Sequence, residues 1–599
     1  MVIYEMTSIV IIEDDETCYD DLYLQTLEFT DLLRLASLNS SAAIYLEKSR
    51  NMRGVPVGDA YSLFDYQIDA LEWMRMREQT PHLGIVGGII CMEMGMGKTL
   101  IGLLHTLSQQ KGVGPTIIVA SKTVMIEWKI HGVDKFLKYC NVLYLHPDFM
   151  TKSAITNLSV DVLKTYDVVI TTYDICISAT KLTNVHEDCF EYGDEHSLMK
   201  GKVVSIILRK KTNITRLQTT RGIGAIYGLV WERIICDESQ KFANYNTKVY
   251  HSMMAICANY RWCLSGTPIR NYDTDIWSQL RFCGYKTIDR APDWKKYGRV
   301  HFADGKLEKT IYVATYTDAG INLPNKSEID VFVELSEQQR IVYDLFLNKI
   351  KKIYKSMMEG DVEFVHVMSN FVRLRQCAIA PYLMSAMAKR TAITKRTDND
   401  SSLFSEFEMS SWKKTDLGIY APKIKKIIDI IKQIPNNEKI CFFTTFTSYS
   451  DLLTAAIDKL LPDCKYRQLD GDTVGADRLN ILDSFRSDDN IRVLLLTYKV
   501  GGEGLNLVEA NHCIFGEPWW SNAVLRQAKA RVWRRGQTKP VFIYNIISTS
   551  TLEERVLEIC KEKDNMTCSY INDKSENTKI TMQDVGLNKI MMGRILKLS

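Results

Sequence analysis

Two series of short, uninterrupted apolar runs limit the possible folds more than any other feature of this sequence. The first series contains GGIICM, TIIVA, DVVITT, RIICDE and RWCLSG, and the second contains KICFFTT, RVLLLT, HCIFGE and VFIYNII. Apolar runs of about four to eight residues that alternate with helix-compatible segments are typical of parallel strands buried on both faces. The sequence therefore predicts an α/β fold with two lobes, each built on its own parallel sheet covered by helices.

The stretch between the two series has a helical pattern instead. Apolar residues three and four apart in SEQQRIVYDLFLNKIKKIYKSMM and FVHVMSNFVRLRQC predict helices, and the polar stretch around TDNDSS predicts a loop. The expected organisation is an acidic N-terminal segment at 1–55, a first lobe at 56–325, a helical insertion and linker at 326–420, a second lobe at 421–565 and a C-terminal tail at 566–599.

The composition argues against several classes of protein. The 599 residues carry a net charge of only +3, so any basic surface for nucleic acid must be local. The 15 cysteines form no CxxC pair, which predicts reduced core thiols rather than zinc ligands. The first residues do not resemble a signal peptide, and no run reaches the roughly 18 apolar residues of a membrane helix. We expect a soluble intracellular protein that does not bind a membrane.

The stretch IICMEMGMGKTLIG has the parts of a phosphate-binding loop. A strand is expected before the loop and a helix after it, and Gly95 and Gly97 would let the backbone close on phosphate. Lys98 would neutralise the β and γ phosphates of ATP, and the Thr99 hydroxyl would bind Mg²⁺. Met92 stands where the usual pattern has glycine, so an incidental GKT in a buried strand-to-helix turn is the alternative.

Two further groups of charged residues suit phosphate chemistry. In RIICDESQ, Asp237 is placed to hold Mg²⁺, and Glu238 to orient and deprotonate the attacking water. Such acids are often only solvated, but a pair that follows GKT by one lobe-length indicates an ATPase. In QAKARVWRRGQTKP, Arg531 and Arg534 share a helical face and could reach ATP on the first lobe, where they would stabilise the developing charge. A basic surface helix is the alternative reading of that stretch.

Over about residues 60–560, these motifs and their order resemble the Swi/Snf-type ATPases of helicase superfamily 2. In the first lobe, LFDYQIDALEWM resembles the Q motif, EMGMGKT motif I, PTIIVASKTVMIEW motif Ia, VVITTYD the following DNA-contacting motif, CDESQ motif II and LSGTPIRN motif III. In the second, ICFFTTFTSYSDLL resembles motif IV, YRQLDGDTVGADR its extension, LLLTYKVGGEGLNL motif V and ARVWRRGQTKPV motif VI. The resemblance implies two RecA-like lobes with a helical insertion between them.

Finer features resemble a subgroup. RWCLSGTP, WSQLRF, RLRQCAIAPYL and EPWWSNAVLRQA resemble the repair-linked branch, whose members often carry a RING finger between the lobes. No cysteine lies between Cys377 and Cys441, so the RING finger is absent here. The compact chain also resembles the global-transactivator-like proteins of large DNA viruses.

The resemblance implies roles for single residues. Gln67 would contact the adenine base, and Gly502 would lie at the nucleotide together with the two arginines. The candidates for contact with nucleic acid are Thr171, Thr172, Ser265, Thr267, Thr445, Lys499, Asn506 and Trp520. An ordinary turn or helix-cap role is the alternative for the polar residues, and packing of the lobe is the alternative for the aromatic pair Trp519 and Trp520.

The sequence departs from the family pattern in two motifs. Motif II has Ser239 and Gln240 where the family usually has Ala and His, and motif VI has Ala530 and Trp533 where Asp and His are usual. Hydrolysis is expected to persist because both acids and both arginines are present. Gln240 and its partners in motif III are expected to transmit between ATP and nucleic acid.

The expected activity is DNA-dependent ATP hydrolysis with ATP and Mg²⁺. It would drive translocation along double-stranded DNA and remodel or displace DNA-bound proteins, nucleosomes among them, in transcription, repair or chromatin. One alternative is a strand-separating DNA or RNA helicase, although the sequence contains no recognisable wedge element. Another is a DNA-binding coactivator scaffold with a weak ATPase. The expected location is the nucleus, or a cytoplasmic viral factory for a viral protein.

Overall fold

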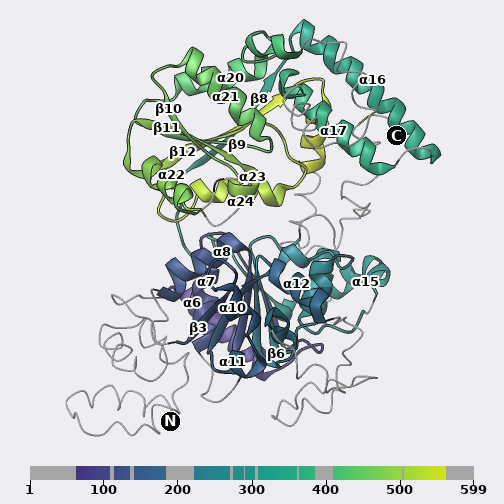
Figure 1. Ribbon diagram of the computed structural model, residues 1–599, viewed down its shortest axis with the longest axis vertical. Coiled ribbons are helices and arrows are strands. Elements are labelled where there is room, and N and C mark those ends of the chain that lie inside the picture. Colours follow the sequence, from purple (N-terminus) through teal and green to yellow (C-terminus); the bar gives the residue numbers. More distant parts are fainter. Residues whose placement is uncertain are drawn as a thin grey trace. The chain divides into compact units, whose positions relative to one another are not determined.

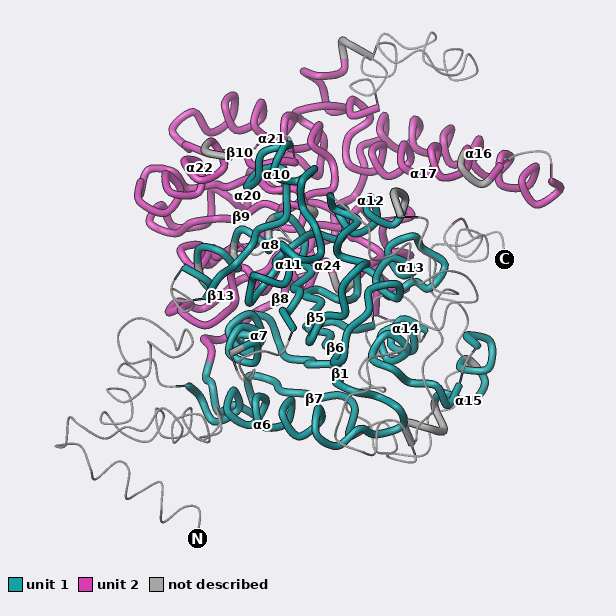
Figure 2. The backbone as a smooth tube through the Cα atoms, turned by 60° about the horizontal axis from the view of Figure 1, so that its bottom comes forward, with its two compact units in different colours: residues 1–322 teal, residues 323–599 magenta. Residues whose placement is uncertain are grey.

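The computed structural model describes both lobes and the helices that separate them in the sequence (Figure 1). The described residues are 63–107, 114–134, 140–183, 222–269, 274–288, 290–303, 308–360, 363–384, 409–471, 473, 475–501, 505–561 and 596. The N-terminal segment 1–55 lies outside them, as does the tail 566–599 apart from Leu596. The chain forms two compact units, residues 1–322 and 323–599, which have different colours in Figure 2.

A seven-stranded parallel sheet forms the first lobe. Its strand order is β3-β4-β2-β5-β6-β1-β7, and every neighbouring pair is parallel. The strands are β1 Gly87–Met92, β2 Thr116–Ala120, β3 Val142–Leu145, β4 Val168–Thr172, β5 Trp231–Asp237, β6 Ala258–Ser265 and β7 Ile311–Ala314. All residues of β1, β2, β4 and β5 are buried, which explains their continuous apolar runs.

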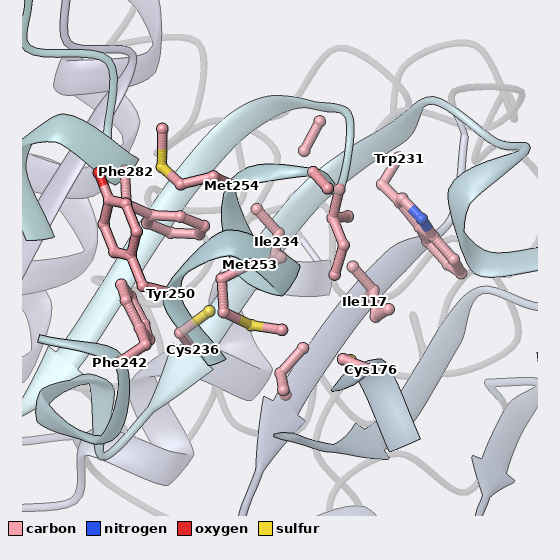
Figure 3. Packing of buried hydrophobic residues seen from close by; sticks show 14 of the residues in the cluster. Ile117, Cys176, Trp231, Ile234, Cys236, Phe242, Tyr250, Met253, Met254 and Phe282 are labelled. Atoms are coloured by element: carbon pink, nitrogen blue, oxygen red, sulfur yellow. The ribbon is translucent and has the colours of Figure 1, made fainter. Parts of the chain in front are cut away.

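Helices and a core of large side chains complete the first lobe. The helices are α6 Asp65–Gln79, α7 Lys98–Leu107, α8 Lys122–Glu127, α10 Lys152–Thr156, α11 Val160–Lys164, α12 Tyr173–Thr183, α13 Lys248–Met254, α14 Thr274–Phe282 and α15 Ala291–Ala303. Shorter turns are the π-helix η1 Trp128–Val133 and the 3₁₀ helices η5 Gly222–Tyr227, η6 Ser239–Phe242 and η7 Glu308–Thr310. Among the side chains drawn in Figure 3, Phe242, Tyr250 and Phe282 lie together on one side of the view and Trp231 lies on the other.

A buried charged cluster joins four elements of this lobe. Glu78 of α6 accepts hydrogen bonds from Arg233 of β5 at 2.7 and 2.6 Å, and from the Trp262 indole of β6 at 2.9 Å. His105 of α7 lies 2.7 Å from the same carboxylate. Burial raises the pKa of the Glu78 carboxyl, but the charges and hydrogen bonds of His105 and Arg233 outweigh it and hold the pKa well below its usual range. The cluster therefore fixes the Q-motif helix to the sheet.

Glu78→Gln is expected to lower the free energy of unfolding by about 3 kcal/mol, because Arg233 would stay buried without its counter-charge. Urea denaturation followed by tryptophan fluorescence measures the change. Asp161→Asn is the matched control, since it breaks an ion pair with Lys164 in which both side chains are largely exposed. Equal midpoints for the two variants would contradict a stabilising role for the cluster.

The second lobe is a six-stranded parallel sheet with the order β10-β11-β9-β12-β13-β8. The strands are β8 Lys326–Val333, β9 Lys439–Thr444, β10 Lys465–Leu469, β11 Ile491–Thr497, β12 Ala510–Phe515 and β13 Val541–Ser548. The helices are α20 Pro422–Gln433, α21 Thr447–Leu460, α22 Gly475–Ser487, α23 Tyr498–Gly501 and α24 Asn522–Val532. The predicted α/β fold with two parallel sheets is confirmed.

The helical insertion is confirmed as well, but it begins later than expected. α16 (Glu337–Glu359) and α17 (Phe364–Ile379) pack on each other through a shared apolar cluster, and η8 (Met409–Lys414) follows. Residues 326–333, which were assigned to the insertion, form β8 and pair with β13 along the whole strand. This part of the prediction was wrong because β8 is an exposed edge strand, whose polar residues interrupt the apolar run of a buried strand.

No disulfide joins the cysteines that the structure describes, and each of them except Cys140 is buried. Within the described ranges, no group of His, Cys, Asp and Glu side chains could hold a metal by itself. No helix in the part of the chain that the structure describes is long and apolar enough to cross a membrane.

Candidate ATP-binding and hydrolytic site

The phosphate loop connects β1 to α7. Gly95 and Gly97 have φ values of 86° and 87°, in the left-handed region that favours glycine. A Cβ atom on Gly97 would also lie 2.6 Å from Nε2 of Gln67, so a side chain there would displace the Gln67 amide in addition to straining the backbone. α7 begins at Lys98, so its first backbone N–H groups border the loop and can bind an anion.

The Lys98 ammonium is hydrogen-bonded to the backbone at the start of the phosphate loop. It is 9% exposed and donates to the backbone carbonyls of Met92 at 2.8 Å and Glu93 at 3.0 Å. A Cβ atom built on Gly266, in the LSGTP stretch after β6, would lie 3.5 Å from Nζ. The cation thus lies between its own loop and the end of the neighbouring strand, where a polyphosphate on the loop could take over its hydrogen bonds.

Gln67 lies directly beside the phosphate loop. Its Nε2 donates to the Met96 carbonyl at 3.2 Å, and its Oε1 accepts from the Phe64 backbone N–H at 3.2 Å. The Tyr66 hydroxyl donates to the same Met96 carbonyl at 3.1 Å. The Q-motif helix therefore holds the loop, and contact of Gln67 with adenine remains a prediction.

Asp237 ends β5 at the same edge of the sheet, where β6 alone separates β5 from β1. It is 4% exposed, and its carboxylate accepts from the Trp128 indole at 2.7 Å and from the Glu238 backbone N–H at 2.8 Å. Burial and the Glu238 charge raise the pKa of Asp237 to about 6, against the opposing effects of Trp128 and Lys98. A bound cation would stabilise the charged form of this buried carboxylate. Oxygen ligands from Asp237 and Thr99 suit Mg²⁺.

Trp128 is a site residue to which no role was assigned from the sequence. It begins η1 and is fully buried, and a Cβ atom on Gly102 of α7 would lie 2.9 Å from its ring. The ring therefore packs on the phosphate-loop helix while its N–H holds Asp237. It ends the quoted stretch PTIIVASKTVMIEW, but only the tertiary fold brings it to the acid.

Trp128→Phe removes the N–H and keeps an aromatic ring. We expect the Mg²⁺ concentration for half-maximal ATP hydrolysis to rise about tenfold, as for the loss of a side chain that orients a metal ligand. Trp277→Phe is the control, because its buried indole donates to the Ile288 carbonyl instead. A similar rise in both variants would show that loss of a buried indole, rather than the contact with Asp237, causes the effect.

A hydrogen-bonded path leads from Glu238 to β6. Gln240 donates through Nε2 to the Glu238 carboxylate, and the Ser265 hydroxyl donates to Gln240 Oε1 at 2.7 Å. Ser265 Oγ also accepts from the Thr267 backbone N–H at 3.0 Å. Glu238 itself has φ 53°, an unfavourable region for a residue with a side chain, and such strain is often found at functional sites. The amide of Gln240 therefore joins motif II to motif III.

A second contact in the same region involves Ser239, the other departure in motif II. Its hydroxyl donates to Gln279 Oε1 of α14 at 2.6 Å, and Gln279 Nε2 donates to the Pro268 carbonyl at 2.7 Å. Gln279 was not singled out from the sequence. Two separate side-chain bridges thus join the segment after β5 to the last residue of β6 and to the segment after β6.

The four hydroxyl residues of lobe 1 assigned to nucleic acid are buried in the structure. Thr171 is fully buried and donates to the Leu145 carbonyl at 3.0 Å. Thr172 accepts from the Ile175 backbone N–H at 3.3 Å, which is a turn role at the start of α12. The Ser265 hydroxyl donates to Gln240, as described above. Thr267 is 6% exposed. The structural roles weighed for these residues are therefore present, and their contact with nucleic acid remains a prediction.

In lobe 2, the partly buried Trp520 ring packs against the helical insertion. Its ring is stacked on Trp519 with centroids 4.0 Å apart, and the Arg375 guanidinium of α17 lies 4.7 Å from the Trp520 centroid. The ring also contacts Phe371 of α17. The packing role weighed as the alternative is therefore present, since α17 brings a buried cation and a second aromatic ring to this pair, and contact of Trp520 with nucleic acid remains a prediction.

The remaining lobe 2 candidates differ in their surroundings. Thr445 donates its backbone N–H to the buried Glu517 carboxylate at 2.6 Å, and Asn506 is exposed. Lys499 belongs to α23, with its side chain outside the described part, and Gly502 lies outside the described residues altogether.

The two arginines border the segment that follows Gly502. Arg531 lies in the last turn of α24, is 7% exposed, and accepts at its carbonyl from the Leu507 N–H at 3.0 Å. Arg534 Nη1 donates to the Leu505 carbonyl at 3.3 Å. Leu505 and Leu507 of motif V are thus hydrogen-bonded to the two arginines of motif VI.

These elements define a P-loop ATPase with two RecA-like lobes: a glycine loop between a buried parallel strand and a helix, and an acid pair at the end of a nearby strand. The chain belongs to the SNF2-related family. An SNF2-related domain matches residues 66–383, and a helicase conserved C-terminal domain matches residues 422–536. The protein is accordingly an ATP-hydrolysing enzyme.

Relatives come from viruses and from cells. A protein of Invertebrate iridescent virus 6 named helicase 172L is 43% identical, covering 90% of this chain and 95% of its own. A protein of Orgyia pseudotsugata multicapsid polyhedrosis virus named global transactivator is 22% identical, with 88% and 95% covered. Human DNA excision repair protein ERCC-6 is 25% identical over 82% of this chain, which spans only 31% of that protein.

A solved structure is also similar. The Sulfolobus solfataricus SWI2/SNF2 ATPase core in complex with dsDNA is 21% identical and is aligned over 91% of this chain and 99% of its own, with a TM-score of 0.35.

Proposed function

We propose that the protein uses ATP hydrolysis to move along double-stranded DNA and thereby displaces or remodels DNA-bound proteins. The observation that carries this proposal is the path from Glu238 through Gln240 to Ser265. It joins the carboxylate suited to activating water to the strand end whose hydroxyls are the candidates for nucleic-acid contact. A change in the position of Glu238 during hydrolysis would therefore displace Gln240 and, through it, Ser265 of motif III.

In the proposed mechanism each group of the first lobe has one task. Lys98 moves from its loop carbonyls to the phosphates of ATP, and Glu238 accepts the proton of the attacking water. Asp237 and Thr99 would hold Mg²⁺, which when bound neutralises charge on the phosphate oxygens. Arg531 and Arg534 stabilise the charge that develops as the γ-phosphoryl group leaves.

The names of the relatives support a role on DNA, since they include a DNA excision repair protein, a transactivator and a helicase. We place the activity in transcription, repair or chromatin, in the nucleus or, for a viral protein, in a cytoplasmic viral factory. Nucleosomes are one candidate substrate. Strand separation by a helicase and a scaffold role with a weak ATPase are the competing functions.

Steady-state ATP hydrolysis by the whole chain tests the proposal, with Lys98→Ala as the blank. The assay compares no nucleic acid with single-stranded DNA, duplex DNA, RNA and nucleosomes, and a triplex displacement assay on duplex DNA reports movement. Strong stimulation by duplex DNA, with displacement of the third strand and without unwinding of plain duplex, is the expected result. Stimulation only by single strands or RNA would favour a strand-separating helicase. Hydrolysis no faster than the blank would favour the scaffold.

A further inference from the structure

The chain passes from lobe 1 to lobe 2 through residues 315–325, and each lobe holds its own end of this segment. We infer that residues 315–325 form a tether that couples the position of the phosphate loop to the position of the two arginines. Tyr316 and Trp533 are the positioning residues at its two ends. The inference rests on the proposed use of Arg531 and Arg534 by ATP bound to lobe 1.

The lobe 1 anchor is attached to the phosphate loop itself. The Tyr316 backbone N–H donates to the Glu93 carboxylate at 2.6 Å, and the Tyr316 hydroxyl donates to the Met94 carbonyl. The Glu93 backbone N–H in turn donates to the Ala314 carbonyl at 3.2 Å. Glu93 and Met94 immediately precede Gly95, and Tyr316 is 6% exposed, so a shift of the loop would carry the start of the tether with it.

The next residues form a compact, hydrogen-bonded turn. Asp318 accepts from the Thr315 backbone N–H at 3.0 Å and from the Thr315 hydroxyl at 2.7 Å. The Ile321 N–H donates to the Tyr316 carbonyl at 2.9 Å, and the Gly320 N–H donates to the Thr317 carbonyl at 3.1 Å. Because these bonds hold the turn together, it transmits a displacement of Tyr316 instead of absorbing it.

The lobe 2 anchor is Trp533, the residue that follows α24, the helix that contains Arg531. The Trp533 indole donates to the Pro324 carbonyl at 2.8 Å, and the Lys326 ammonium lies 4.6 Å from the Trp533 ring centroid. The Val541 N–H donates to the Asn325 carbonyl at 2.9 Å, which fixes the same residues to β13. Trp533 is one of the two residues between Arg531 and Arg534 in the chain, so the end of the tether holds the segment that joins the two arginines.

Between the turn and the second anchor lie Asn322 and Leu323, where the boundary between the two compact units falls. If both anchors hold, any rotation of one lobe against the other must be taken up by the backbone of these two residues. Hinges commonly consist of a few loop residues of this kind. The tether thus confines lobe movement to a path on which the phosphate loop and the arginines move together.

The test uses the whole chain with one donor and one acceptor dye, attached through encoded amino acids at the exposed positions Lys164 of α11 and Leu479 of α22. Energy transfer is measured without nucleotide and with a non-hydrolysable ATP analogue and Mg²⁺, and kcat and nucleotide affinity are measured beside it. The variants are Tyr316→Phe, Trp533→Phe and the double variant. Tyr227→Phe is the control, because its buried hydroxyl lies within hydrogen-bonding distance of the Cys176 and Ser252 carbonyls, to one of which it donates, away from the loop.

Each single variant is expected to lose most of the nucleotide-dependent change in energy transfer and to lower kcat about fivefold, with a smaller change in nucleotide affinity. The double variant is expected to lower kcat no further than the stronger single variant, since both act through one element. The effects of two substitutions at separate sites that share no partner would normally add.

Additive losses, or an unchanged energy-transfer response in Tyr316→Phe, would overturn the tether while leaving the proposed function intact. A wild-type protein that hydrolyses ATP without any change in energy transfer would contradict the proposed use of the arginines, and the tether with it. A loss in Tyr227→Phe equal to that in Tyr316→Phe would assign the effect to general destabilisation and would also overturn the tether.

Discussion

Glu238→Gln is expected to bind ATP and to hydrolyse it on the order of a thousandfold more slowly than the wild type. The change keeps the shape of the side chain but removes the carboxylate that would accept a proton from water. The amide can still meet Gln240, so the path to Ser265 need not be disrupted. Single-turnover hydrolysis gives the rate, and equilibrium binding of a fluorescent ATP analogue gives the affinity.

Two comparisons make this result interpretable. Lys98→Ala should lose both affinity and turnover, because its ammonium is expected to neutralise the phosphates. Gln240→Ala leaves the carboxylate in place and removes only the neighbour, so its intrinsic rate should fall far less than that of Glu238→Gln. A normal kcat in Glu238→Gln would remove Glu238 as the base and direct attention to Asp237.

Arg534→Ala is expected to lower kcat by on the order of a thousandfold while the affinity for ATP changes little. An arginine that meets the γ-phosphoryl group stabilises charge that is largest in the transition state, so its loss acts on the rate. The fold of lobe 2 should tolerate the change, because the Leu505 carbonyl that Arg534 contacts is one of several links between motif V and motif VI. The measurement is the same pair of assays.

Arg535→Ala is the matched control, since it removes the same charge from the next residue, which is exposed. Its kcat should stay close to that of the wild type. If Arg534→Ala lowered only the affinity for DNA and left intrinsic hydrolysis intact, Arg534 would be assigned to DNA binding instead. An equal effect of both changes would indicate that net charge on this surface is what matters.

The lobes could be predicted from sequence where strands are buried on both faces. β1, β2, β4 and β5 are such strands, and each was visible as a continuous apolar run. β8 was missed because it lies at an edge of its sheet, where side chains meet water and no pattern of uniform burial arises.

The site divides in a similar way. The phosphate loop and the Asp237–Glu238 pair were located because a strand, a turn and a helix in immediate succession fix their positions locally. Trp128 and Gln279 could not be given roles, because their partners lie 109 and 40 residues away in the chain and only the folded sheet brings them together. The contact of Trp520 with Arg375 could not be predicted either, because Arg375 comes from the helical insertion, which the sequence does not place beside it.

The side chain that joins Glu238 to Ser265 is an amide, where the family usually has an imidazole. An imidazole gains or loses a proton near neutral pH, and the same contact would then alternate between a charged and an uncharged form. Gln240 has no such proton to exchange. The Gln240 side chain that links Glu238 to the end of β6 therefore carries the same charge in an acidic compartment as in a neutral one, and its protonation cannot serve as a brake on the enzyme.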